Sequence, residues 1–70
     1  MIGYEIQGRR TERGTDGRVV RDRVRLASAD NRDAAFEIAN TMAADDYKTW
    51  IFQTEQSSGK KTYVLFGVLP

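Results

Sequence analysis

Four stretches of this chain have residue patterns typical of β-strands, and one stretch with helical spacing separates the first two from the last two. Hydrophobic and polar residues alternate from Ile2 to Gln7 and over residues 18–27. Residues 47–55 and 61–69 are rich in β-branched and aromatic residues, which also favour strands. Because successive side chains of a strand point to opposite faces of a sheet, alternation of this kind predicts β-strands. The two pairs of strands are therefore expected to be hairpins on either side of a helix.

The central stretch has the spacing of an amphipathic helix. Its hydrophobic positions are Ala35, Ile38, Ala39, Met42 and Ala43, with Phe36 on the flank. Asp30 is the expected N-cap, with its carboxylate accepting from the amide of Asp33. The helix is expected to end near Ala44, because the carboxylates of Asp45 and Asp46 oppose the negative end of the helix dipole.

This order predicts an α+β fold, β-β-α-β-β, with a four-stranded and mostly antiparallel sheet and one helix packed on one face. Seventy residues are expected to form one domain, 1–70. A chain of this size has a small core, and the sequence has no cysteine that could reinforce it. Dimerisation is the remaining way to bury more surface, so a homodimer stays open.

Residues 8–17 contain three glycines and no hydrophobic side chain, which indicates a mobile loop or a ragged hairpin end. In the following strand, hydrophobic side chains alternate with arginines: Val20, Val24 and Leu26 against Arg21, Arg23 and Arg25. Asp22 interrupts the hydrophobic set. We therefore expect the first hairpin to have a polar outer face formed by the arginines.

The last two strands carry large hydrophobic side chains on both faces. Alternation places Trp50 and Phe52 opposite Tyr47, Thr49 and Ile51, and it places Val64, Phe66 and Val68 opposite Tyr63, Leu65 and Leu69. One helix covers only one face of a sheet, so hydrophobic side chains remain on the other. Such a patch usually marks an interface. The alternative is that the long first hairpin or a second chain covers it.

The residue types needed for most catalysis are absent from the sequence. It has no histidine and no cysteine, which removes the commonest general base, the commonest nucleophile partner and the usual zinc ligands. The carboxylates of Asp30, Asp33 and Glu37 lie on one helix face, where they are more often solvated than metal-binding. The segment 59–62 lacks the remaining positions of a phosphate-binding loop. We expect no enzyme activity, no cofactor and no metal site.

Charge is distributed unevenly along a chain whose net charge is only +1. Residues 9–25 carry seven arginines and three acidic residues, a net charge of +4. Residues 28–46 carry one arginine and five acidic residues, a net charge of −4. Three interpretations of the basic segment stay open: contact with a nucleic-acid backbone while Tyr47 or Tyr63 stacks on bases, docking on an acidic protein surface, or a solvated hairpin. The candidate partner-binding residues are Arg9, Arg10, Arg21, Arg23, Arg25, Asp33, Glu37, Tyr47 and Tyr63.

Residues 33–68, DAAFEIANTMAADDYKTWIFQTEQSSGKKTYVLFGV, place a helix rich in small residues before an aromatic hairpin. This arrangement resembles that of small anti-CRISPR proteins encoded by phages and mobile elements. The resemblance implies a non-catalytic inhibitor that occupies a surface of a CRISPR surveillance complex. It covers half of the chain and assigns no role to any single residue.

The leading functional hypothesis is a protein-binding module, a phage-encoded inhibitor of a host complex, that uses its charged faces and exposed sheet aromatics. The alternatives are a nucleic-acid-binding domain that uses the arginine-rich hairpin and a structural or self-associating small protein. No stretch is apolar for the roughly 20 residues that a membrane span requires. We therefore expect no membrane contact and a cytoplasmic location. The leading hypothesis implies a protein partner.

Overall fold

The computed structural model describes residues 2–69, except for the side chains at positions 19 and 20. Its elements are β1 (Ile2–Arg13), β2 (Val19–Ala29), α1 (Arg32–Ala44), β3 (Lys48–Ser57) and β4 (Lys60–Leu69). The strands form one antiparallel sheet in the order β2-β1-β3-β4. The predicted α+β class, the element order and the single helix are confirmed. The face occupied by Val20, part of the predicted alternation, lies outside the described side chains.

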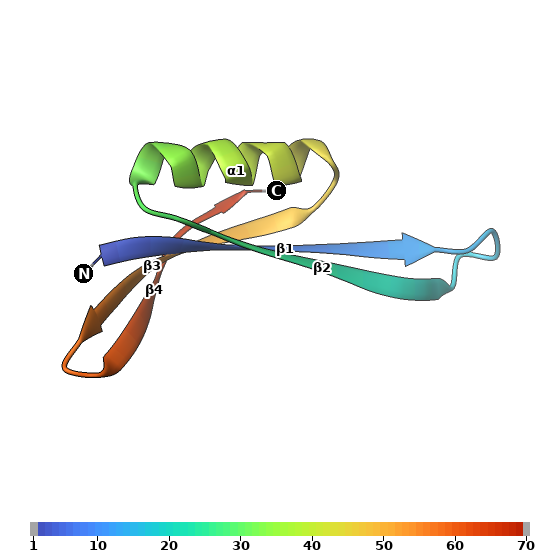
Figure 1. Ribbon diagram of the computed structural model, residues 1–70. Helices are drawn as coiled ribbons and strands as arrows, with labels where there is room; N and C mark the ends of the chain where they lie inside the picture. The colour runs from blue at the N-terminus through green and yellow to red at the C-terminus, as the bar shows by residue number, and fades with distance from the viewer. Residues whose placement is uncertain (1, 70) are drawn as a thin grey trace.

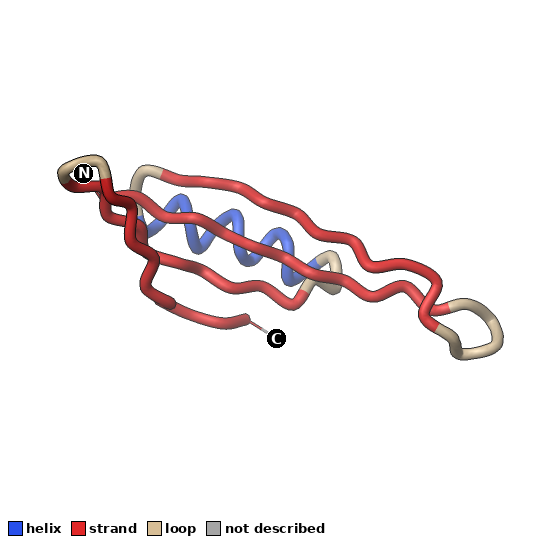
Figure 2. Tube along the Cα trace, turned by 90° about the horizontal axis from the view of Figure 1, so that it is seen from below, coloured by secondary structure: helices blue, strands red, loops and turns tan. Residues whose placement is uncertain are grey.

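Helix α1 lies along one face of the sheet, and no described element covers the other face (Figures 1 and 2). The helix ends at Ala44, as its acidic C-terminal flank predicted. The predicted N-cap was wrong. Asn31 caps the helix, and its side chain accepts a hydrogen bond of 2.8 Å from the amide of Ala34. Asn31 has the extended backbone that an N-cap requires, one residue after the Asp30 that the sequence favoured.

The core lies between α1 and the two central strands. The buried hydrophobic side chains among the described residues are Ile6, Ala35, Ala39, Met42, Tyr47 and Ile51. Ile6 of β1 pairs with Ile51 of β3, and the small alanines of α1 allow the helix to lie close above this pair. The core is therefore one residue layer thick, and few side chains are removed completely from water.

The β1–β2 hairpin extends well beyond the end of α1 (Figure 1). A helix of 13 residues is about 20 Å long, whereas the 12 residues of β1 span roughly 40 Å. Of the two alternatives predicted for residues 8–17, the mobile loop was wrong, and the irregular hairpin end is confirmed, since β1 continues to Arg13 with a register shift after Glu12 and residues 14–18 form the turn. We call residues 9–25 the arm. Its charged side chains pair across the two strands, which allows a segment without hydrophobic residues in β1 to remain extended.

A β-bulge in the last hairpin changes the faces predicted for the end of β4. The register shifts between Ile51 and Phe52, which leaves Phe66 as an extra residue in β4. Phe66 turns to the helix side, where its ring contacts Tyr4 and Phe36 edge to face, with ring centroids 5.7 and 5.8 Å apart. Val68 consequently pairs with Trp50 on the open side of the sheet instead of sharing a face with Phe66. The alternation predicted for β3 is confirmed, since Thr49 and Ile51 are buried below the helix.

Gly8 is required where β1 passes below the end of α1. A Cβ atom at this position would lie 3.0 Å from Sδ of Met42 and 3.2 Å from a ring carbon of Tyr47. We expect Gly8→Ala to destabilise the fold by about 1–3 kcal/mol, because overpacking forces neighbouring side chains from their positions. Urea unfolding followed by circular dichroism measures the change. Gly67→Ala is the matched control, since a Cβ there meets nothing within 4 Å, and equal losses for both variants would contradict the packing argument.

Candidate functional site

The arm carries an ion-pair network on the same side of the sheet as α1. The carboxylate of Glu12 lies 3.0 Å from Nη2 of Arg10 and 2.9 Å from Nε of Arg23, and Arg21 is 4.0 Å away. The hydrogen bond from Arg10 and the charges of the three arginines hold the pKa of Glu12 below its ordinary value. Three guanidinium groups thus share one carboxylate, so this side of the arm keeps an excess of positive charge.

Arg10 also joins the arm to the C-terminal end of α1. Its Nη1 donates to the backbone oxygen of Asp45 at 3.0 Å and to the Asp45 carboxylate at 3.2 Å. A cation at this position offsets both the negative end of the helix dipole and the carboxylate beside it. The guanidinium groups of Arg10 and Arg25 lie over the ring of Tyr47, 5.2 and 5.6 Å from its centroid. This junction fixes the root of the arm against the helix.

The opposite side of the arm has a smaller polar cluster. Asp22 accepts hydrogen bonds from Arg9 at 2.7 Å and from the hydroxyl of Thr11 at 2.9 Å. These two bonds hold the pKa of Asp22 below its ordinary value, the bond from Arg9 having the larger effect. Asp22 therefore neutralises Arg9 on the side of the sheet away from α1, where Val24 and Leu26 also lie.

The structure changes the interpretation of several candidate residues. Arg21, Arg23 and Arg25 lie on the helix side, so the expected outer polar face of the hairpin was wrong. Arg9 lies on the opposite side of the arm from these three and from Arg10. The first hairpin instead presents Val24 and Leu26 to water, because helix-side positions of β2 near the core are occupied by small alanines that fit below α1.

The two tyrosines differ in accessibility. Tyr47 is 4% exposed below two guanidinium groups, so the predicted stacking of this ring on a base was wrong. Tyr63 is exposed on β4, with the ammonium group of Lys61 5.3 Å from its ring centroid. Asp33 and Glu37 are exposed on the outer side of α1, and neither side chain forms an ion pair with another residue in the described range 2–69.

The face of the sheet away from α1 carries five of the eight exposed large hydrophobic side chains among the described residues. We call it the open face, and its hydrophobic members are Val24, Leu26, Trp50, Phe52, Tyr63, Leu65 and Val68. Val24 and Leu26 of β2 are 64% and 65% exposed. Pairing across the strands places Leu26, Gln7, Trp50 and Val68 in one continuous row. The sequence predicted that such a surface would remain, but it did not predict that β2 contributes to it.

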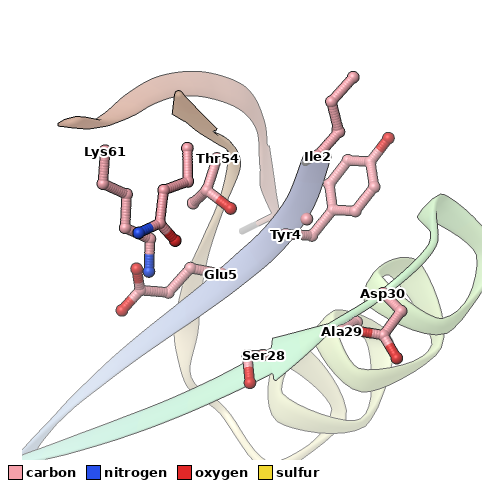
Figure 3. A pocket seen from close by; sticks show the side chains of 10 residues that line it. Ile2, Tyr4, Glu5, Ser28, Ala29, Asp30, Thr54 and Lys61 are labelled. Carbon is pink, nitrogen blue, oxygen red and sulfur yellow. The ribbon is translucent and has the colours of Figure 1, made fainter. Parts of the chain in front are cut away.

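Two hollows indent the open face. A slot of about 280 Å³ is lined by Gln7, Gly8, Arg9, Val24, Trp50 and Phe52. A larger hollow of about 680 Å³ lies where the β3–β4 hairpin bends away from β1. Figure 3 shows Glu5 extending into this hollow from β1, with Thr54 and Lys61 on the hairpin side. Oε2 of Glu5 is buried and accepts no hydrogen bond from any residue that the structure describes.

Within residues 2–69 there is no group of three or more histidine, cysteine, aspartate or glutamate side chains that could hold a metal ion. No helix in that range is long and apolar enough to cross a membrane. No protein family, curated protein or solved structure matches the chain. The open face and the arm are therefore interpreted from their own chemistry.

The lowered pKa values of Glu12 and Asp22 make the arm sensitive to acid. Because both are lower in the folded chain than in the unfolded chain, their ion pairs stabilise the arm above the ordinary pKa values of 4.5 and 3.8. This stabilisation is lost as the pH falls through the lowered values. NMR titration should give carboxylate midpoints below 4.5 for Glu12 and below 3.8 for Asp22, with increased motion of arm amides at the acid end.

Glu12→Gln is the control for this titration. The amide cannot carry the charge that the three arginines share, so the variant should show increased motion of the β1 part of the arm at neutral pH. Ordinary midpoints in the wild-type chain would contradict the ion pairs described for the arm.

Proposed function

We propose that this protein is a non-catalytic protein-binding module and that the open face is its docking surface. The observation that carries the proposal is the set of hydrophobic side chains that β2, β3 and β4 present on this face, on either side of Gln7 in β1. Large exposed patches of this kind mark interaction sites in soluble proteins. The absence of histidine and cysteine from the sequence supports a binding role over a catalytic one.

The contacts within the arm favour the open face over the arm as the primary surface. Six of the seven arm arginines lie within 4.0 Å of a carboxylate, and the seventh, Arg13, donates to the backbone oxygen of Gly17. Nucleic-acid phosphates would have to compete with these carboxylates. The hydrophobic side chains of the open face, in contrast, have no competing contact on their exposed side.

An inhibitor of the anti-CRISPR type is one form of this proposal. In that form the partner is a protein of a CRISPR surveillance complex. Purified surveillance complexes provide a direct assay, in which the chain should bind the complex and reduce its capture of target DNA. A chain that binds no such complex would limit the proposal to other protein partners.

Leu26→Asp and Arg21→Gln separate the open face from the arm. Both changes lie on β2 and lower the net charge by one unit, but Leu26 is on the open face and Arg21 is on the helix side. We expect Leu26→Asp to reduce capture of the protein partner by at least about 30-fold, as at interface hot spots, because it places a charge in an apolar contact. Arg21→Gln should change capture by less than about threefold. Affinity capture with quantitative mass spectrometry measures both.

The three lysines of the chain provide a second readout. Lys48 and Lys61 lie on the open face, and Lys60 lies on the opposite side of β4. An amine-reactive cross-linker should therefore join the partner to Lys48 and Lys61 in preference to Lys60. Binding of labelled DNA that weakens with salt and with Arg21→Gln, but not with Leu26→Asp, would contradict the proposal and favour the nucleic-acid alternative.

A further inference from the structure

We infer that the partner on the open face is a second copy of this chain, which packs sheet against sheet about a two-fold axis and leaves both helices outside. This inference rests on the proposed function, since it names the occupant of the same surface. In such an arrangement each copy offers the same patch to the other, so the patch has to be complementary to itself. The exposed area of the chain, the edges of its sheet, and the charges and shape of the open face all favour this arrangement.

The chain exposes more surface than a monomer of its size. A folded monomer of 7.9 kDa exposes about 4,400 Å², whereas this chain exposes 5179 Å². Its radius of gyration is 14.1 Å, against about 11 Å for a compact domain of 70 residues. The extra surface is roughly 800 Å². It is close to the area that each partner buries in a protein interface of standard size.

The edges of the sheet are less suited to pairing with a second copy than its face. Four of the five residues 21–25 in the outer strand β2 are charged, and charged side chains protect an edge from another strand. The other outer strand, β4, is interrupted by the bulge at Phe66 and begins with two lysines. Bulges and lysines are also features that prevent edge pairing. Self-association through the open face avoids both obstacles.

The charges of the open face are compatible with a second copy of the same face. Arg9 and Asp22 neutralise each other, and the remaining charged groups include Lys48, Lys61 and Glu5. Both signs are thus present, so two copies can align unlike charges. A strongly basic or acidic partner would find no face of uniform opposite charge.

The shape of the open face supports the same conclusion. Leu26 protrudes beside the slot that is lined by Val24, Trp50 and Phe52, so one face contains both a projecting side chain and a recess. Two twisted sheets can pack face to face with their strands about 30° apart. The result would be a four-layer molecule, helix–sheet–sheet–helix, with an arm extending from each copy.

Sedimentation equilibrium of the purified chain tests the inference. The wild type should have a mass twice 7.9 kDa and dissociate on dilution. Leu65→Asp should weaken the dimer by at least about 30-fold, because it buries a charge in the apolar interface. Val64→Asp is the matched control. Val64 precedes Leu65 in β4, and the two residues have similar exposed fractions, 62% for Val64 and 54% for Leu65. Val64 points to the helix side, so this variant should dimerise like the wild type. Circular dichroism confirms that both variants are folded.

Cross-linking of a mixture of unlabelled and ¹⁵N-labelled chains identifies the lysines that lie at the contact between the two copies. Peptides that join the two isotopes through Lys48 or Lys61 support packing of open face on open face. A dimer that Leu65→Asp leaves intact overturns this inference, and it overturns the proposed function as well if the variant also leaves capture of other proteins unchanged. A wild-type chain that stays monomeric overturns the inference. If Leu65→Asp then abolishes capture of a different protein, the proposed function stands, and if capture is unaffected, the proposed function is overturned as well. A monomer that shifts DNA favours the arm as the functional surface.

Discussion

A single helix of 13 residues has to cover a four-stranded sheet, and this limit produces the two exposed features of the molecule. Along the strands, the helix ends about 20 Å before β1 does, so the first hairpin continues as an arm. Across the sheet, the helix occupies one face, and the hydrophobic side chains of the other face remain in water. Residues 2–69 provide no second layer that covers this face, so the candidate docking surface follows from the limited area that one helix can cover.

The arm remains aligned with the body of the protein because of the junction at the end of α1. Asp45 is unfavourable at the C-terminus of a helix, but Arg10 donates to both its backbone and side-chain oxygens. The same guanidinium group covers Tyr47, which closes one end of the core. The arginines near the root of the arm thus serve the fold, which explains why a segment of net charge +4 does not by itself indicate a nucleic-acid-binding surface.

Much of the fold follows from local patterns. The alternation in β3 correctly separated Thr49 and Ile51 from Trp50 and Phe52, and the acidic pair after Ala44 correctly ended the helix. The errors occur where long-range pairing decides the outcome. β1 extends through residues 8–13, which have no hydrophobic side chain, because Glu12 and Asp22 pair with arginines of the arm. The bulge at Phe66 allows its ring to pack between Tyr4 and Phe36.

The sequence by itself determined the order of the elements, the separation of basic and acidic segments and the presence of more hydrophobic faces than one helix can cover. Periodicity of two defines the two faces of a strand, but it does not state which face receives the helix. That choice was made by tertiary packing. Gly8, Ala27 and Ala29 are small enough for α1 to lie close to the sheet, so the helix covers their side and the arginines of β2 lie beside it. Val24 and Leu26 consequently face water on the open face, next to Trp50 and Phe52.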